Sequence, residues 1–206
     1  MLNVIFILKL GNRFNQYSLV FGHADGGTLR ELLKDKFQSL KWVDKISLGS
    51  QLASSITCLH DEGIVHGDLN SQNILIHQNS IKLVDFGQTK EVSKELSNMP
   101  YNDPKLFNRR GNNVSNKKND VFGVGVLLWE ISSGTPPFKD EPYDSYFDFQ
   151  GRREVPVPGT PEDYKKIYTE CWDDETKRRP EMRDVKTLAL DGTHPLLYIP
   201  SRYMDE

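Results

Sequence analysis

The sequence is poor in the features of secreted, membrane-spanning or nucleic-acid-binding proteins. It has only 2 cysteines, Cys58 and Cys171, so neither a disulfide framework nor a structural zinc site is supported, and a reducing compartment is expected. The formal net charge of -3 leaves no basic excess for nucleic acid or an anionic membrane. The apolar run at residues 1–8 is broken by Asn3 and is far shorter than the roughly 20 residues of a membrane span. We therefore expect a soluble, cytoplasmic protein with no nucleic-acid partner and no membrane span.

The chain has enough apolar material for a folded core. Hydrophobic residues make up 37% and aromatic residues 10% of the sequence, which excludes global disorder. On a prior of one domain per about 150 residues, a chain of 206 residues is one large domain or one and a half.

The first part of the chain predicts a strand followed by two helices. Residues 17–21 are typical of a strand, and residues 25–27 form a turn signal. Thr28 with Glu31 three residues later is a capping-box pattern, which predicts that a helix begins there. A longer helix is predicted over residues 42–60, where apolar residues recur at helical spacing: Val43, Ile46, Ala53, Ile56 and Leu59.

The middle of the chain predicts a hairpin and then a mostly irregular segment. Two β-prone runs, 74–76 and 81–84, are separated by residues 77–80, which predicts a hairpin with a four-residue loop. Residues 88–120 have little periodicity, so we expect mostly loop, with the basic pairs of this segment in solvent.

Beyond this segment the sequence favours buried and helical structure. Residues 121–131 are apolar on nearly every side, so periodicity leaves strand or helix open, and Gly123 and Gly125 count against a helix. Helices are expected over residues 162–172 and 183–190.

Two short motifs flank the predicted hairpin. The first, H-G-D-L-N-S-Q-N, runs from His66 to Asn73, and the second is Asp85-Phe86-Gly87. A hairpin of this length brings Asp68, Asn73 and Asp85 together, and their carboxylate and amide oxygens suit a hard cation such as Mg²⁺. A carboxylate that does not bind the metal can orient a hydroxyl group and accept its proton. These groups suit phosphoryl transfer, which depends on positioning and charge neutralisation.

These motifs resemble those of the protein kinase family, whose signature is H-R-D-L-x-x-x-N, then D-F-G, then A-P-E. Asp103-Pro104-Lys105 occupies the third place. Residues 119–130 resemble the kinase segment S-D-V-Y-S-x-G-V-x-L-W-E, which favours a buried helix for the apolar run. Cys171-Trp172 and Arg178-Arg179-Pro180 resemble the family's C-W and R-P. The similarity extends from about residue 3 to about residue 190 and is greatest with the tyrosine-kinase-like branch.

The resemblance implies an α+β, protein-kinase-like fold, with a mainly α-helical large lobe and a remnant of the small-lobe β-sheet and hinge. A kinase domain over residues 1–190, incomplete at its N-terminus, would comprise a small-lobe remnant and hinge (1–24) and a large lobe (25–190). Residues 191–206 would form a C-terminal tail. The implied cofactors are ATP and Mg²⁺, and the implied partner is a protein substrate or docking partner.

Carried over residue by residue, the resemblance implies Asp68 as the catalytic aspartate. It implies Asp85 as the main Mg²⁺ ligand and Asn73 as the second, so both also take part in cofactor binding. His66 and Phe86 would pack in the core that aligns the lobes, and have no chemical role.

The strand and turn before Asp25 resemble the kinase hinge, which binds adenine through backbone groups. Phe21 would be the gatekeeper, and the Gly22 carbonyl and Ala24 amide would contact the base. Leu75 would be the apolar floor under the ring. Asp120 would anchor the backbone of the catalytic loop.

Other kinase features are absent or changed. The sequence holds no Gly-rich loop, strand lysine or paired helix glutamate, and all three are expected before residue 1, because residues 3–5 already resemble the segment that follows them. Gly67 replaces the arginine of H-R-D. Lys105 replaces the glutamate of A-P-E, so we expect repulsion between Lys105 and Arg179. Asn70 replaces the lysine of serine/threonine kinases, which leaves acceptor specificity open.

Three hypotheses follow for function. The first is a protein kinase that phosphorylates Ser/Thr (or Tyr) hydroxyls in signal transduction and is weak or inactive as this truncated chain. The second is a pseudokinase that acts as a binding or scaffold module. The third, an unrelated α-helical interaction protein, is disfavoured by the ordered motifs.

Overall fold

The computed structural model describes residues 8–11, 17–20, 24–86, 96–107, 116–140 and 152–185. Its strands are β1 (Leu8–Gly11), β2 (Tyr17–Val20), β3 (Ile74–His77) and β4 (Ser80–Leu83). Its α-helices include α1 (Leu29–Lys36), α2 (Trp42–Asp61), α3 (Lys117–Ser133) and α4 (Glu162–Cys171). Short 3₁₀ helices lie at Phe37–Ser39, Leu96–Tyr101, Pro104–Phe107 and Thr176–Arg178.

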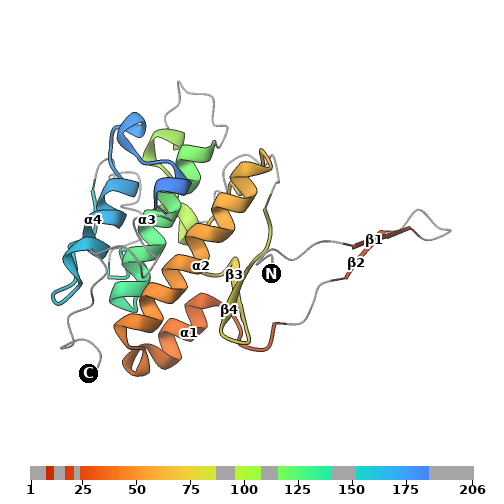
Figure 1. The fold of residues 1–206 in the computed structure, drawn as a ribbon, viewed down its shortest axis with the longest axis horizontal. Coiled ribbons are helices and arrows are strands. Elements are labelled where there is room, and N and C mark those ends of the chain that lie inside the picture. Colours follow the sequence, from red (N-terminus) through yellow and green to blue (C-terminus); the bar gives the residue numbers. More distant parts are fainter. Residues whose placement is uncertain are drawn as a thin grey trace.

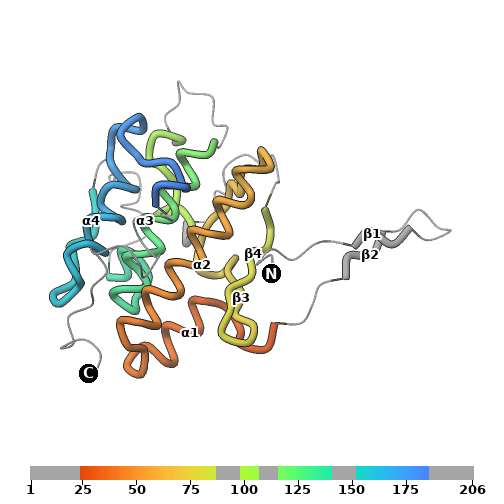
Figure 2. Tube along the Cα trace, in the orientation of Figure 1, coloured from red at the N-terminus to blue at the C-terminus, as the bar shows by residue number. Residues whose placement is uncertain are grey.

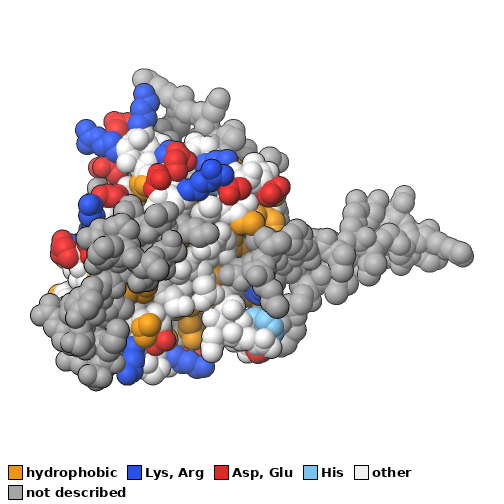
Figure 3. Space-filling model, in the orientation of Figure 1, with side chains coloured by type: hydrophobic (Ala, Val, Ile, Leu, Met, Phe, Trp, Pro, Cys, Tyr) orange, Lys and Arg blue, Asp and Glu red, His pale blue; other side chains and the backbone are white. Residues whose placement is uncertain are grey.

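The helices pack around α3. Helix α3 lies between α2 and α4, and the β3–β4 hairpin packs beside α1 and α2 (Figures 1 and 2). One apolar cluster joins side chains of all these elements, from Leu29 in α1 to Cys171 in α4. Charged side chains of both signs intermingle on the face shown in Figure 3. The predicted α+β architecture is confirmed, with its helical part built around one long buried helix.

The two pairs of strands are antiparallel. In the β1–β2 pair Leu8 lies opposite Val20 and Gly11 opposite Tyr17, so the strand predicted over residues 17–21 is confirmed, apart from Phe21, which lies outside the described residues. In the β3–β4 pair Ile74 lies opposite Leu83 and His77 opposite Ser80.

The predicted four-residue hairpin loop is wrong. Only Gln78 and Asn79 connect the strands, with φ angles of 48° and 60°. Positive φ at both central residues is the geometry of the two-residue turn that matches the right-handed twist of its strands. His77 and Ser80 can therefore pair, so β3 is one residue longer than predicted and β4 begins and ends one residue earlier.

Helix α1 begins with the predicted capping box. The Thr28 amide donates to Glu31 Oε2 at 2.8 Å, and the Glu31 amide donates to Thr28 Oγ1 at 3.2 Å. These two bonds satisfy orphan donors at the start of the helix, and they fix the helix that carries Arg30.

Helix α2 has the predicted extent, but not every apolar residue at helical spacing faces the core. Val43 is 55% exposed. At 3.6 residues per turn Val43 lies about 140° around the helix from Ile56. Leu48 and Leu52 are buried instead, together with Ile56.

The apolar run of residues 121–131 is helical, and its glycines are explained by close packing. A Cβ atom on Gly123 would lie 3.1 Å from Leu69 Cβ, on the loop after His66. A Cβ atom on Gly125 would lie 2.9 Å from Cys171 Cβ, in α4. Each glycine costs the helix about 1 kcal/mol relative to alanine, but it lets another element approach α3 closely.

The segment before α3 is more ordered than predicted. Two 3₁₀ helices and the first turn of α3 lie within residues 88–120. Lys117 donates to the carbonyl of His60 at the end of α2, and Lys118 donates to the Arg179 carbonyl at 2.7 Å. Lys117 is exposed, as expected of a solvated pair, whereas Lys118 is half-buried. Both lysines donate to backbone carbonyls because carbonyls at helix ends and in loops need donors. The other basic pair, at 109–110, lies outside the described residues.

The C-terminal helices agree with the sequence where they are described. Helix α4 ends at Cys171, with Trp172 as its C-cap. Residues 182–185 are helical, and the remainder of the helix predicted over 183–190 lies outside the described residues. The proposed boundaries at residues 24 and 190 stay predictions.

Candidate active site

The loop after His66 is anchored by one buried carboxylate of α3. Asp120 Oδ2 accepts from the His66 amide at 2.8 Å, and Asp120 Oδ1 accepts from the Gly67 amide at 2.9 Å. His60 Nε2 also lies 2.8 Å from Asp120 Oδ2. Gly67 has φ +85°, a left-handed backbone that glycine adopts at little cost. The structure thus gives Asp120 the anchoring contacts that the sequence predicted.

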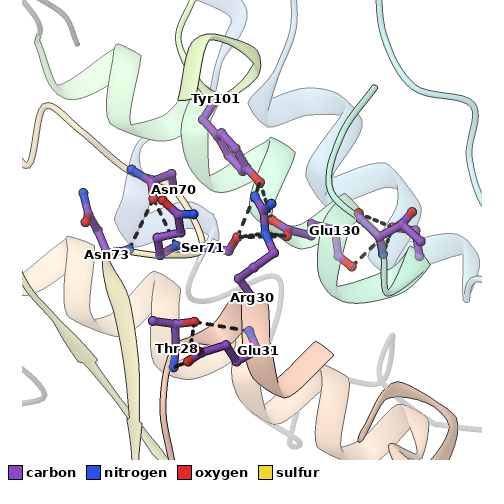
Figure 4. Close-up of polar contacts among 11 residues, drawn as sticks. Thr28, Arg30, Glu31, Asn70, Ser71, Asn73, Tyr101 and Glu130 are labelled. Carbon is purple, nitrogen blue, oxygen red and sulfur yellow. Dashed lines mark hydrogen bonds and ion pairs between the residues drawn. The ribbon is translucent and has the colours of Figure 1, made fainter. Parts of the chain in front are cut away.

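Asn70 braces the interior of the same loop. Its side chain is buried, and its Oδ1 atom accepts from the amides of Gln72 at 3.0 Å and Asn73 at 3.3 Å. Its Nδ2 atom donates to the Asp68 carbonyl at 3.2 Å. These contacts, partly visible in Figure 4, hold Asp68 and Asn73 at a fixed spacing.

The structure brings the predicted catalytic and metal-binding residues together. Asn73 Nδ2 donates to the Asp68 carbonyl at 2.8 Å and to Asp68 Oδ2 at 3.2 Å. The Asn73 carbonyl accepts from the Val84 amide at 3.1 Å, which places Asp85 one residue beyond this contact. Asp85 is exposed and has φ 57°, a strained conformation for a residue with a side chain. The pairing of β3 with β4 is therefore what gathers the three residues.

The donor set fits a partly hydrated Mg²⁺ ion. Within the described part of the chain, no three or more His, Cys, Asp or Glu side chains could by themselves hold a metal ion. Asn73 and Asp85 instead offer one amide oxygen and one carboxylate. Mg²⁺ is usually bound by few protein ligands, with waters and phosphate oxygens completing its coordination. Because the Asn73 nitrogen is used by Asp68, the amide oxygen is left for such an ion.

His66 has the surroundings of a packing residue. It is buried, and its ring centroid lies 6.1 Å from that of Phe86. Burial lowers the pKa of His66 to about 4, against a weaker opposing effect of Asp120 and Asp85. The ring is neutral near pH 7, which agrees with the predicted packing role.

The predicted repulsion at Arg179 is wrong. Arg179 Nη1 lies 2.6 Å from Asp103 Oδ2, and both side chains are almost fully buried. Lys105 is exposed, and its amide donates to Asp103 Oδ1 at 2.9 Å. The carboxylate that pairs with the arginine therefore lies two positions before the place of the A-P-E glutamate. The acid in Asp103-Pro104-Lys105 was the signal that could have revealed this exchange.

The predicted adenine-binding residues are only partly described. Phe21 and Gly22 lie outside the described residues, whereas Ala24 is half-buried. The segment after Ala24 pairs with β3, since the Ile76 amide donates to the Gly27 carbonyl at 2.8 Å and Thr28 forms a bridge with Leu75. Leu75 thus lies beside the segment that leaves the predicted hinge.

Sequence reasoning missed a second buried carboxylate on α3. Glu130 is 0% exposed and contacts Arg30, Ser71 and Tyr101. The sequence did carry a signal for it, since Glu130 is an acidic residue within an otherwise apolar helix. A carboxylate buried in this way needs charged or hydrogen-bonding partners. The sequence offered no way to identify those partners.

The family of the chain is shown by comparison with known proteins. The sequence model of the protein tyrosine and serine/threonine kinase family matches residues 2–188. A probable LIM domain-containing serine/threonine-protein kinase of Dictyostelium discoideum is 31% identical over 173 residues, covering 77% of this chain and 25% of that protein. Mitogen-activated protein kinase kinase kinase 13-A of Xenopus laevis is 30% identical over 181 residues, covering 82% of this chain and 18% of that protein.

The chain therefore belongs to the protein kinase family, as the motifs predicted. It spans a quarter or less of the length of these relatives. Membership implies the use of ATP and Mg²⁺ and a protein substrate. No helix in the described ranges is both long and apolar enough to cross a membrane.

Proposed function

We propose that this chain provides the catalytic loop and the Mg²⁺ site of a kinase that phosphorylates Ser or Thr hydroxyls of proteins in signal transduction. The observation that carries this proposal is the arrangement of Asp68, Asn73 and Asp85 around one loop and one hairpin. The names of the matched serine/threonine kinases support this acceptor class.

Each of the three residues has a separate role in this proposal. Asn73 and Asp85 would hold Mg²⁺, which when bound neutralises charge on the ATP phosphates. Asp68 would orient the acceptor hydroxyl and accept its proton. The bond from Asn73 to Asp68 Oδ2, at 3.2 Å, fixes the spacing between the metal ligand and the base.

The adenine site is a further part of the proposal. Phe21, Gly22 and Ala24 would form the gatekeeper and the hinge contacts, and Leu75 would lie under the base. The bridge between Thr28 and Leu75 supports this arrangement, because it holds β3 beside the segment that follows Ala24. A cytoplasmic location and the lack of a nucleic-acid partner stay predictions from cysteine content and charge.

We expect the 206-residue chain alone to transfer phosphate slowly. Its sequence holds no G-x-G-x-x-G loop to fix the phosphates, and misplacement of reacting groups can cost about 100-fold in rate. The pseudokinase alternative is not favoured, because the chain carries all three of Asp68, Asn73 and Asp85 and the matched relatives are named as kinases.

Mg²⁺-dependent nucleotide binding and phosphoryl transfer test the proposal separately. We expect Mg-ATP to raise the melting temperature of the chain, because a ligand that binds only the folded state stabilises it. Asp85→Asn should abolish this shift, whereas Asp68→Asn should keep it and lose phosphoryl transfer to a generic protein substrate. The control is Asp61→Asn, which changes an exposed carboxylate paired with Arg183. Equal Mg-ATP shifts in wild type and Asp85→Asn would show that the metal site is assigned wrongly.

A further inference from the structure

Glu130, the last residue of the kinase-like segment 119–130, is the centre of a buried polar cluster. Its Oε1 atom lies 3.0 Å from Arg30 Nε and accepts from Ser71 Oγ at 2.9 Å. Its Oε2 atom accepts from the Tyr101 hydroxyl at 2.8 Å. Arg30 also donates to Ser71 Oγ at 2.8 Å and to the Tyr101 hydroxyl at 2.6 Å. In Figure 4 these four side chains converge from separate elements of the chain.

The position of Glu130 is costly for a carboxylate. It lies in the last turn of α3, where the helix dipole favours cations over anions. Burial raises the pKa of Glu130, and the charge of Arg30 opposes that rise. A buried ion pair often contributes little net stability compared with apolar side chains. Stability therefore gives no sufficient reason for the Arg30–Glu130 pair.

The cluster is tied to the catalytic loop at its centre. Ser71 lies between Asp68 and Asn73, and its hydroxyl contacts both Arg30 and Glu130. The Ser71 carbonyl also accepts from the Arg30 amide at 3.2 Å. Side chain and backbone of this one loop residue are therefore both held, which restricts the loop in two directions.

Tyr101 connects the same cluster to the segment that follows the D-F-G motif. It ends the 3₁₀ helix Leu96–Tyr101 and is 2% exposed. Because its hydroxyl is shared between Arg30 and Glu130, a displacement of this 3₁₀ helix would remove a bond from the group that holds Ser71.

We propose that Arg30 and Glu130 are positioning residues that hold Ser71, set the placement of Asp68 and Asn73, and couple that placement to the segment Leu96–Tyr101. This inference rests on the proposed function for its effect on Mg-ATP, but its effect on the loop can be measured without any activity.

The test uses the 206-residue chain with Arg30→Met and the double variant Arg30→Met/Glu130→Gln. The single variant leaves the buried Glu130 carboxylate without its cation. The double variant also removes the charge of Glu130, but it still lacks the contacts of Arg30 with the loop. Backbone hydrogen exchange over residues 68–73, Mg-ATP affinity and melting temperature are measured for each. The control, Arg183→Met, removes an exposed arginine that pairs with Asp61.

We expect Arg30→Met to lower the melting temperature, to speed exchange in the loop about tenfold or more and to weaken Mg-ATP binding, as loss of charge-assisted hydrogen bonds predicts. The double variant should recover the melting temperature but neither the loop protection nor the affinity. Arg30→Lys, which keeps the charge, should recover part of the loop protection.

Two results would overturn the inference. One is a rate of hydrogen exchange in the loop that is the same in Arg30→Met as in wild type. The other is a double variant that recovers both the loop protection and the melting temperature. That second result would show that the pair has a purely structural role. If the wild-type chain binds no Mg-ATP, the proposed function fails instead, and the exchange rates still decide whether the pair positions the loop.

Discussion

Asp120 and Glu130 hold the same loop from opposite ends of α3 but in different ways. Asp120 lies in the first turn, where the helix dipole stabilises a carboxylate, and it accepts from the backbone amides of His66 and Gly67. Glu130 lies about 15 Å further along the axis. Among the described residues its carboxylate bonds to side chains alone, including those of Arg30 and Ser71.

The difference shows which anchors tolerate sequence change. A backbone amide is present whatever the side chain, so Asp120 keeps its partner at position 67 although glycine replaces the family's arginine. Glu130 depends on particular side chains on three other parts of the chain. We therefore expect Glu130 to lose its hold on the loop when one of its partner side chains is substituted. For Asp120 we expect the largest effect when the aspartate itself is substituted.

The largest effect is predicted for Asp120→Ala. This change leaves the amides of His66 and Gly67 and the ring of His60 without their acceptor, and each buried polar group left unpaired costs about 1–3 kcal/mol. Urea denaturation measures the loss in free energy of unfolding. The matched control is Asp61→Ala, whose exposed pair with Arg183 should be worth about 0–1 kcal/mol. Similar losses in both variants would contradict the anchoring role of Asp120.

His66, whose amide donates to Asp120, and Glu130 should respond to pH in opposite directions. Burial lowers the pKa of His66 to about 4 in the folded chain, against an ordinary value of 6.5. The unfolded chain therefore binds more protons between these values, and stability that is present above pH 6.5 is lost as the pH falls towards 4. The shift corresponds to about 3 kcal/mol.

Glu130 has the reverse sign, because burial raises the pKa of its carboxyl group in the folded chain. Its ionisation therefore lowers stability as the pH rises above 4.5 through the raised value. Unfolding free energies at pH 7 and pH 4.5, compared between wild type and the variants His66→Leu and Glu130→Gln, separate the two contributions. Parallel pH profiles in all three proteins would count against both assignments.

A smaller effect is predicted for Tyr101→Phe. The ring stays buried, but Glu130 Oε2 loses a donor and Arg30 an acceptor, which should cost about 1–3 kcal/mol. Tyr168→Phe is the matched control, since no hydrogen bond is recorded for its buried hydroxyl within the described part of the chain. Equal unfolding free energies of the two variants would mean that the Tyr101 hydroxyl adds nothing to the cluster.

The smallest effect is predicted for Thr28→Ala, which removes the side-chain half of the capping box of α1. N-cap substitutions of this type cost about 1 kcal/mol. Because α1 carries Arg30, loop exchange over residues 68–73 should rise slightly with the loss of stability. Thr28→Ser keeps the hydroxyl and should behave as wild type in the same denaturation experiment.

The sequence was sufficient to predict most helices and strands and the role of Asp120. The capping box at Thr28, the extents of α2 and α4 and the place of the β3–β4 hairpin could be predicted because each depends on neighbouring residues. Asp120 could be predicted from the resemblance to the kinase segment that contains it. The hairpin loop was wrong because two residues with positive φ, neither of them glycine, leave little signal in the sequence.

Contacts between distant side chains were beyond prediction. Arg179 and Asp103 are 76 positions apart in the chain, and the contacts of Arg30 with Tyr101 and Glu130 span still other elements. Periodicity records which face of an element is buried and leaves open which polar groups meet there. The same limit explains Val43. This residue is apolar, as a core residue would be, but it lies on the exposed side of the helix.

The pairing of Arg179 with Asp103 has a consequence for which residues position 105 can accept. A buried guanidinium that loses its carboxylate is strongly destabilising. Because Asp103 supplies that carboxylate, Arg179 does not depend on an acid at position 105, and Lys105 is exposed there. We expect a chain with alanine at position 103 to lose stability with the same lysine at position 105, because Arg179 would then lack the carboxylate that neutralises it.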